Sequence, residues 1–258
     1  VITHIVHRYV CIGAFGINTE NSTETKYKYW KLITHLFSEN YMNNIYKWCC
    51  ENGSALTGHL VLEEGLHGQI IANGACMPHY EYMHIPGMDW LGRNIYDCLT
   101  PMQVSSVCDQ LGIKQRLSET FALCGHNVSF AELKGIYEWQ MVHGINLLCQ
   151  HLEGYSIRGI RKRDYPPAMY NQQPWWSEYD KFVEAMSREG MVLAEGNVKA
   201  NVLLLHPMTT AWTLFDATDE TPVIELQDKF LDDIKKLEEK HVAFHLGDET
   251  LIERHGRI

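Results

Sequence analysis

The feature that most constrains the fold of this chain is a repeated alternation of short apolar segments and amphipathic segments between residues 55 and 190. Each apolar segment has the length of a buried strand, and each amphipathic segment repeats its apolar residues at helical spacing. Crossovers between such elements are right-handed, so successive strands lie side by side and parallel. The predicted strands are 55–62, 80–85, 116–123 and 145–150, and the predicted helices are 64–73, 101–111, 130–143 and 179–189.

Four strand–helix units are half of a (βα)8 barrel, which typically has about 250 residues. An open doubly wound sheet is the alternative. The segments that follow the strands are long and rich in Trp, His, Asp and Arg. This favours the barrel, because barrel enzymes carry their catalytic residues at that end of the strands. We therefore predict an α/β fold in which residues 1–198 are the C-terminal part of a TIM barrel.

Residues outside the alternation predict further elements. A long helix is expected over 26–50, because its apolar residues follow one helical face. Near the other end, 201–206 and 241–245 are predicted strands on either side of a helix that begins at Thr221. This strand–helix–strand unit predicts the beginning of a second α/β domain over 199–258. Since the chain starts at Val1 and stops in this unit, we expect both ends to be cuts within a longer protein.

Composition argues against several classes of protein. With 22 basic and 32 acidic residues, the net charge of −10 disfavours nucleic-acid binding. No apolar run reaches the roughly 18 residues of a membrane span. None of the eight cysteines has C-x-x-C spacing, so we expect reduced, buried thiols in a cytosol-like compartment and no cysteine-based zinc site. No cofactor is predicted, and the sequence is compatible with a homo-oligomer.

Two carboxylates lie at predicted strand ends. Glu119 falls within or at the end of an otherwise apolar strand, where a carboxylate costs free energy unless it is paired or used. Asp89 follows a Pro-Gly turn and stands beside Trp90. This pair suits a sugar, because the acid binds hydroxyls and the indole covers the C–H face of the ring. The structural alternatives are an ion pair between Glu119 and Arg116, and an ordinary turn role for Asp89.

Other polar and aromatic side chains follow the same strands. The alternative for His59 is a hydrogen-bonded core histidine, and for Trp175 it is core packing. A metal site at His79 and His84 is disfavoured, since strand alternation puts them on opposite faces. We expect Glu119, Asp89, His151 and Tyr155 to converge on one concave face. The predicted substrate-binding residues are His59, Asp89, Trp90, His151, Tyr155, Asp164 and Trp175.

Several motifs together resemble a known group of enzymes. They include Pro-Gly-Met-Asp-Trp-Leu-Gly-Arg at 86–93, Lys-Gln-x-Leu-Ser-Glu at 114–119 and Arg-Lys-Arg-Asp-x-Pro-Pro at 161–167. Over about residues 26–215 the chain resembles large bacterial glycoside hydrolases related to the family 106 α-L-rhamnosidases and, more distantly, to clan A β-galactosidases. The segment from residue 201 resembles the start of the amidotransferase-like domain that follows the barrel in such enzymes.

The resemblance implies specific roles. The four strands would be the fifth to the eighth of the barrel, and Glu119 would be the catalytic carboxylate of strand seven. The acid/base Glu of strand four would precede Val1. Within the chain, the residues that could substitute for that second carboxylate are Asp89, Glu63, Glu64 and Glu153.

We therefore predict a bacterial, cytoplasmic glycoside hydrolase region that cleaves O-glycosidic bonds of plant- or glycan-derived sugars. Glu119 is one member of its carboxylate pair. The alternative is a non-catalytic carbohydrate-binding barrel or pseudo-enzyme. A third, weaker interpretation is a sugar isomerase or another barrel enzyme that uses a metal.

Overall fold

The computed structural model describes residues 10, 12–151, 154–196 and 198–256. Contacts divide the chain into two compact units. Unit 1 comprises the described residues of 1–56, 60–84 and 199–258, and unit 2 comprises those of 57–59 and 85–198. This grouping joins N-terminal segments to the C-terminal one, whereas the sequence predicts domains at 1–198 and 199–258. That domain division stays a prediction.

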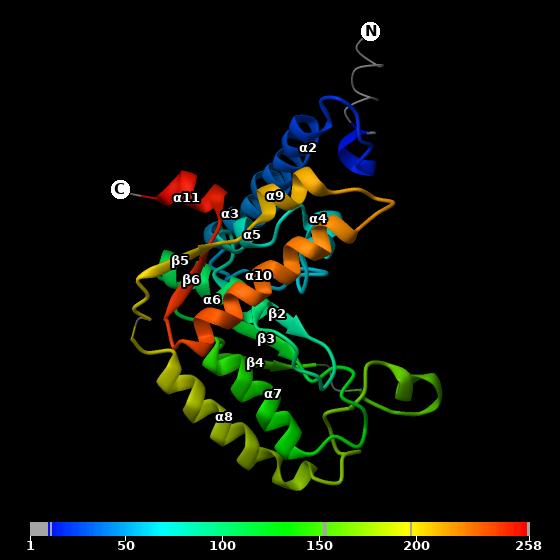
Figure 1. Ribbon diagram of the computed structural model, residues 1–258. Helices are drawn as coiled ribbons and strands as arrows, with labels where there is room; N and C mark the ends of the chain where they lie inside the picture. Colours follow the sequence, from blue (N-terminus) through cyan, green and yellow to red (C-terminus); the bar gives the residue numbers. More distant parts are fainter. Residues whose placement is uncertain (1–9, 11, 152–153, 197, 257–258) are drawn as a thin grey trace. The chain divides into compact units, whose positions relative to one another are not determined.

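Unit 2 is built on a four-stranded sheet in the order β1-β2-β3-β4. All three strand pairs are parallel and follow chain order, which confirms the predicted topology. Figure 1 shows β2, β3 and β4 side by side. The strands are β1 (Thr57–Gly58), β2 (Ile85–Trp90), β3 (Leu117–Thr120) and β4 (Leu147–Gln150).

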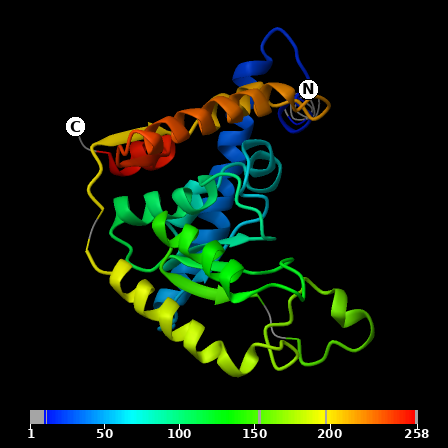
Figure 2. The same cartoon turned by 60° about the horizontal axis from the view of Figure 1, so that its bottom comes forward.

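Three helices alternate with these strands, and Figure 2 shows them from a second direction. They are α6 (Leu99–Leu111), α7 (Phe130–Val142) and α8 (Tyr179–Leu193). Helix α6 packs on β2, and α8 packs on both β4 and α7. Local signals explain two of the boundaries. Ser129 and Glu132 form a reciprocal capping box at the start of α7, and Gly112 ends α6 in the left-handed conformation with φ of 75°.

The structure corrects two of the predicted strands. Residues 80–85 do not form a strand, because a short helix, α5 (Met77–Tyr80), precedes β2. The Pro-Gly pair that was expected to close the strand lies inside β2. Gly87 fits there because a Cβ would approach the carbonyl oxygen of Gly58 to 2.7 Å. The apolar run 55–62 contains only the two-residue β1, and Val61 and Leu62 are exposed.

The predicted end of α8 at Gly190 is also wrong, because the helix continues to Leu193. A Cβ at position 190 would lie 2.6 Å from the carbonyl oxygen of Asn146. Gly190 therefore permits a close approach of helix and loop rather than ending the helix.

Unit 1 contains two parallel strands, β5 (Val202–Leu205) and β6 (Phe244–Gly247), which confirms the predicted strand–helix–strand unit. The predicted helix over 26–50 is realised as two helices joined by a π-helical turn at Phe37–Met42. The core of the unit gathers around Trp30, Leu66 and Trp212. Further helices of unit 1 are α2 (Ser22–Leu36), α3 (Asn43–Glu51), α4 (Leu66–Asn73), α9 (Met208–Leu214), α10 (Thr221–Glu239) and α11 (Glu249–His255).

In the part of the chain that the structure describes, no helix combines the length and the apolarity needed to cross a membrane.

Candidate functional site

Three polar side chains lie side by side across the sheet of unit 2. Asp89 on β2 is the register partner of Glu119 on β3, and Glu119 is the register partner of Cys149 on β4. Neighbouring strands are about 4.8 Å apart, and register partners point to the same face of a sheet. The side chains of Asp89 and Glu119 are 20% and 28% exposed, and Cys149 is exposed. We call this surface, defined by these three residues, the carboxylate face.

His59 connects the two carboxylates. It follows β1 directly, and its Nε2 lies 3.1 Å from Oε2 of Glu119. Its Nδ1 lies 4.0 Å from Oδ2 of Asp89, too far for a hydrogen bond but close enough for charge attraction when the imidazole is protonated. The His59 side chain is 27% exposed, so it is not the buried core histidine of the structural alternative. The result is an imidazole between two acids on an accessible surface.

The ion pair proposed as the structural alternative for Glu119 is absent. Arg116 pairs instead with Asp109, and it donates a hydrogen bond to the carbonyl oxygen of Gly144 over 3.2 Å. The influence of Glu119 extends to the next strand. Partial desolvation of the sulfur, together with the charge of Glu119, raises the pKa of the Cys149 thiol above its usual range. Glu119 therefore affects the pKa of a neighbouring thiol on the carboxylate face. It does not form an ion pair with Arg116.

Trp90 is separated from Asp89 by strand alternation. Its side chain points to the opposite face of β2, where it is 1% exposed. The indole packs against Trp139 of α7 and Tyr96, with ring centroids 4.5 Å and 5.0 Å away. The expected pairing of carboxylate and indole at one sugar is therefore not formed by Asp89 and Trp90.

Two other predicted residues follow β4. The backbone N–H of His151 donates to the carbonyl oxygen of Thr120 over 2.8 Å, which extends the strand pairing by one residue. Alternation then gives His151 the same parity as Cys149. Its ring stacks on Tyr165 with centroids 5.5 Å apart. Tyr155 is 99% exposed, so the structure does not bring it to the carboxylate face.

The remaining residues predicted from the sequence have different surroundings. Asp164 is exposed at the end of a short 3-10 helix, Gly159–Arg163. Trp175 donates its indole N–H to the carbonyl oxygen of Val128 over 3.0 Å and packs on Phe130, as its structural alternative predicts. Glu63 is buried in unit 1, where it accepts a 2.7 Å hydrogen bond from the Tyr80 hydroxyl.

Glu64 also belongs to unit 1 and is partly exposed. Glu153 lies outside the described residues.

Cys149 is not among the residues predicted from the sequence. We expected buried thiols, and five of the seven described cysteines are buried, but Cys50 and Cys149 are exposed. The signal was present, because Cys149 stands inside a predicted strand that pairs with the strand of Glu119. Only the register shows that these two residues are neighbours.

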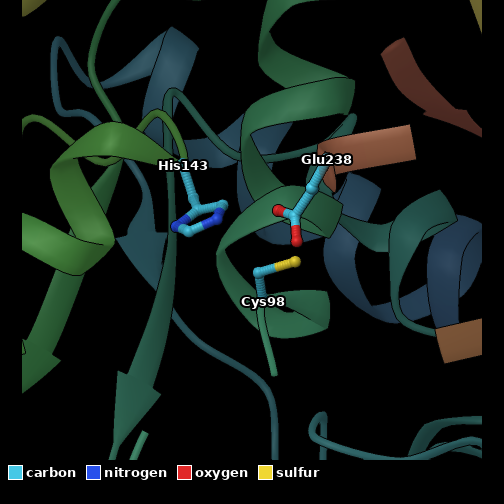
Figure 3. Close-up of side chains that lie close together, drawn as sticks. All are labelled: Cys98, His143 and Glu238. Atoms are coloured by element: carbon cyan, nitrogen blue, oxygen red, sulfur yellow. The ribbon is translucent and has the colours of Figure 1, made fainter. Parts of the chain in front are cut away.

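Figure 3 shows Cys98 and His143, which both belong to unit 2. The thiol of Cys98 contacts Met102 in the first turn of α6, and His143 is bonded to the carbonyl oxygen of Trp139 at the end of α7. Glu238, drawn with them, lies in α10 of unit 1. These residues take no part in the carboxylate face.

Comparison with known proteins finds a similar fold in two glycoside hydrolases at low sequence identity. No protein-family model and no curated protein matches the chain. A rhamnosidase from Novosphingobium sp. PP1Y has a similar structure, with a TM-score of 0.63 and 16% identity over 75% of this chain and 20% of that one. Gan42B, a GH42 β-galactosidase, has a TM-score of 0.58 and 10% identity over 91% of this chain and 37% of its own. At these identities the likeness shows the fold alone, and the chain spans only a minor part of either protein.

Proposed function

We propose that this chain is part of a glycoside hydrolase that cleaves O-glycosidic bonds, with Glu119 as one catalytic carboxylate. One observation carries the proposal: Glu119 and Asp89 are register partners on adjacent parallel strands, partly exposed on one face, with His59 between them. The similar folds of a rhamnosidase and a GH42 β-galactosidase support it. In this proposal the four strands are the C-terminal half of a (βα)8 barrel related to family 106, and residues 199–258 begin an amidotransferase-like domain.

Glu119 has the surroundings of an anionic nucleophile or base. Glycosidic cleavage passes through an oxocarbenium-like transition state, which a carboxylate stabilises either by forming a covalent bond or by activating water. An N–H of His59 directed at Glu119 holds the orientation of the carboxylate. Partial exposure leaves the carboxylate accessible to a sugar.

Asp89 and His59 supply binding groups. A carboxylate beside the catalytic one accepts hydrogen bonds from sugar hydroxyls, and the imidazole between them adds a donor. His151 follows β4 and has the same parity as Cys149, which supports a place for it on the carboxylate face. Tyr155 and Asp164 stay predictions as residues of the exposed segment after β4. Trp90 and Trp175 contribute to packing in this proposal, so an aromatic platform for the sugar must come from other residues.

The proposed mechanism also requires a second carboxyl group that acts as the proton donor. Within the described part of unit 2, Glu119 is the only glutamate on a strand. The resemblance implies that the acid/base Glu precedes Val1 in a longer protein, and we propose that origin for it. The alternative function, a carbohydrate-binding barrel without catalysis, is favoured by this single strand glutamate. Bacterial origin and a cytoplasmic location stay predictions.

The test compares Glu119→Gln with Cys149→Ser, its register neighbour, in the complete protein. Gln keeps the shape of the side chain but cannot become an anion. We expect Glu119→Gln to lower kcat/KM on aryl α-L-rhamnosides or β-galactosides by a factor on the order of a thousand, about 4 kcal/mol. The Cys149→Ser control should retain most of the activity, and both variants should melt like the wild type.

Retained turnover in folded Glu119→Gln protein would contradict the catalytic role. A wild-type protein that binds these sugars without hydrolysing them would establish the non-catalytic alternative.

A further inference from the structure

Cys50 lies in the last turn of α3 in unit 1, with its sulfur beside an imidazole. The distance from its Sγ to Nε2 of His84 is 3.3 Å. The other ring nitrogen, Nδ1, accepts a 2.9 Å hydrogen bond from the backbone N–H of Leu56. A ring nitrogen that accepts a hydrogen bond carries no hydrogen, so the neutral imidazole has its hydrogen on Nε2. His84 is therefore a donor to the sulfur of Cys50.

Backbone pairing and ring stacking hold this donor in place. The backbone N–H of His84 donates to the carbonyl oxygen of Leu56 over 2.9 Å, so the two residues are joined by a reciprocal pair of hydrogen bonds. Tyr46 stacks on the imidazole, with ring centroids 4.4 Å apart and planes 23° from parallel. The ring consequently has little freedom to turn its Nε2 away from the sulfur.

Tyr46 is a second neighbour of Cys50. It precedes Cys50 by one helical turn of α3, so the two side chains lie on the same face of the helix. Burial and the neighbouring Cys50 raise the pKa of the Tyr46 hydroxyl, so it keeps its proton. The exposed sulfur of Cys50 thus has an imidazole donor on one side and a protonated hydroxyl group nearby.

The donors matter because the thiolate is the nucleophilic form of cysteine. The unpaired carbonyls at a helix C-terminus disfavour an anion, so the position of Cys50 in α3 alone would make the thiol less reactive. The N–H of His84 acts in the opposite direction, since a donor directed at a sulfur stabilises its negative charge, and the nearby Tyr46 hydroxyl adds a second polar group. Removing a donor should therefore have a measurable effect on reaction rate.

A buried histidine of the same unit shows what a structural role looks like. His79 has Ser38 Oγ 2.8 Å from its Nδ1 and the carbonyl oxygen of Asn73 3.0 Å from its Nε2. Burial lowers the pKa of His79 to about 4. His84, in contrast, is partly exposed, and its Nε2 faces the Cys50 thiol, which solvent can reach.

We propose that Cys50, His84 and Tyr46 form a reactive-thiol site that exchanges with low-molecular-weight disulfides. The thiol proton of Cys50 leaves to solvent, and the thiolate attacks one sulfur of the disulfide. A new S–S bond to Cys50 forms as the original S–S bond breaks. The departing half leaves as a thiolate and takes a proton from solvent, so Cys50 is oxidised and the departing sulfur is reduced. His84 remains a hydrogen-bond donor throughout, and Tyr46 keeps its proton.

The first measurement uses the two exposed cysteines of the unmodified chain. The aromatic disulfide dithiobis(nitrobenzoate) is the probe, and peptide mass spectrometry assigns the rate of modification to each cysteine. Cys149 is the internal control, because it is exposed like Cys50 but stands beside the Glu119 carboxylate. We expect Cys50 to react at least about tenfold faster than Cys149. Equal rates, or a faster Cys149, would overturn the proposal.

The second measurement removes one donor at a time. His84→Asn keeps an acceptor for the Leu56 N–H but lacks the distal N–H, and Tyr46→Phe keeps the ring without the hydroxyl. We expect His84→Asn to slow the modification of Cys50 by about fivefold or more, and Tyr46→Phe by less. Cys149 should react at its wild-type rate in both variants, which excludes a general loosening of the fold. An unchanged Cys50 rate in His84→Asn would also overturn the proposal.

Discussion

The two faces of the unit 2 sheet are built from alternate residues of the same strands, yet their surroundings differ. Met88, Trp90, Ser118 and Thr120 are fully buried on one face, which we call the packed face. Asp89, Glu119 and Cys149 define the carboxylate face and are accessible. A strand thus supplies stability on one side and reactive groups on the other. Substitutions on the two faces should therefore affect different measurements.

The largest effect is expected on the packed face. Trp90→Ala removes a buried indole between Trp139 and Tyr96, and we expect it to lower the free energy of unfolding by about 3–5 kcal/mol. Urea denaturation measures this loss. On the carboxylate face, Glu119→Gln should change stability by less than about 1 kcal/mol. Similar losses in both variants would remove the distinction between the faces.

An intermediate effect is expected for the imidazole between the carboxylates. His59→Ala removes the hydrogen bond to Glu119, so we expect kcat/KM for aryl glycosides to fall about tenfold to a hundredfold, or 1.4–2.8 kcal/mol. Steady-state kinetics measures the fall, and the thermal melt serves as the control. If activity is unchanged, His59 does not orient Glu119 during catalysis. A large loss of stability would instead assign His59 to packing.

The smallest effect is expected at Cys149. Burial and the Glu119 charge raise the pKa of its thiol, so at neutral pH it should be largely protonated and slow to react. In Glu119→Gln the charge is gone, the pKa falls toward its ordinary value, and alkylation by iodoacetamide should accelerate severalfold. The pH–rate profile of Cys149 should shift to lower pH. An unshifted profile would mean that Glu119 is screened from its register neighbour.

The exposed cysteines extend the comparison to unit 1. Cys149 has a carboxylate as its register neighbour, whereas Cys50 has an imidazole N–H directed at its sulfur and a Tyr hydroxyl nearby. Both thiols are exposed, so a difference in their reaction rates reports the effect of the groups around each sulfur. The two thiols are therefore paired reporters of opposite electrostatic surroundings within one chain.

Strand order was accessible from the sequence because it follows from local pattern and chain chirality. The alternation of apolar and amphipathic segments predicts βα units, and right-handed crossovers permit one parallel order. Element ends were less accessible. Pro86 and Gly87 read as a turn, yet they lie inside β2 because β1 has only two residues and approaches Gly87 closely. Local preference for a turn was overridden by a tertiary contact.

In the candidate site, too, some residues could be identified from the sequence and others only from the structure. Glu119 was identifiable from sequence, because a carboxylate in an apolar strand carries a cost that only pairing or function offsets. Its neighbours were not, since His59 is 60 residues away in the chain and meets Glu119 only through the packing of β1, β2 and β3. Trp90 points away from Asp89 because β2 extends to residue 90 and successive side chains of a strand point to opposite faces.

By itself, then, the sequence determined the βα order and the presence of a costly carboxylate, because periodicity and side-chain chemistry are local properties. Only the tertiary structure decided which face each residue occupies and which distant side chains meet, because a shift of one residue in a strand exchanges its two faces.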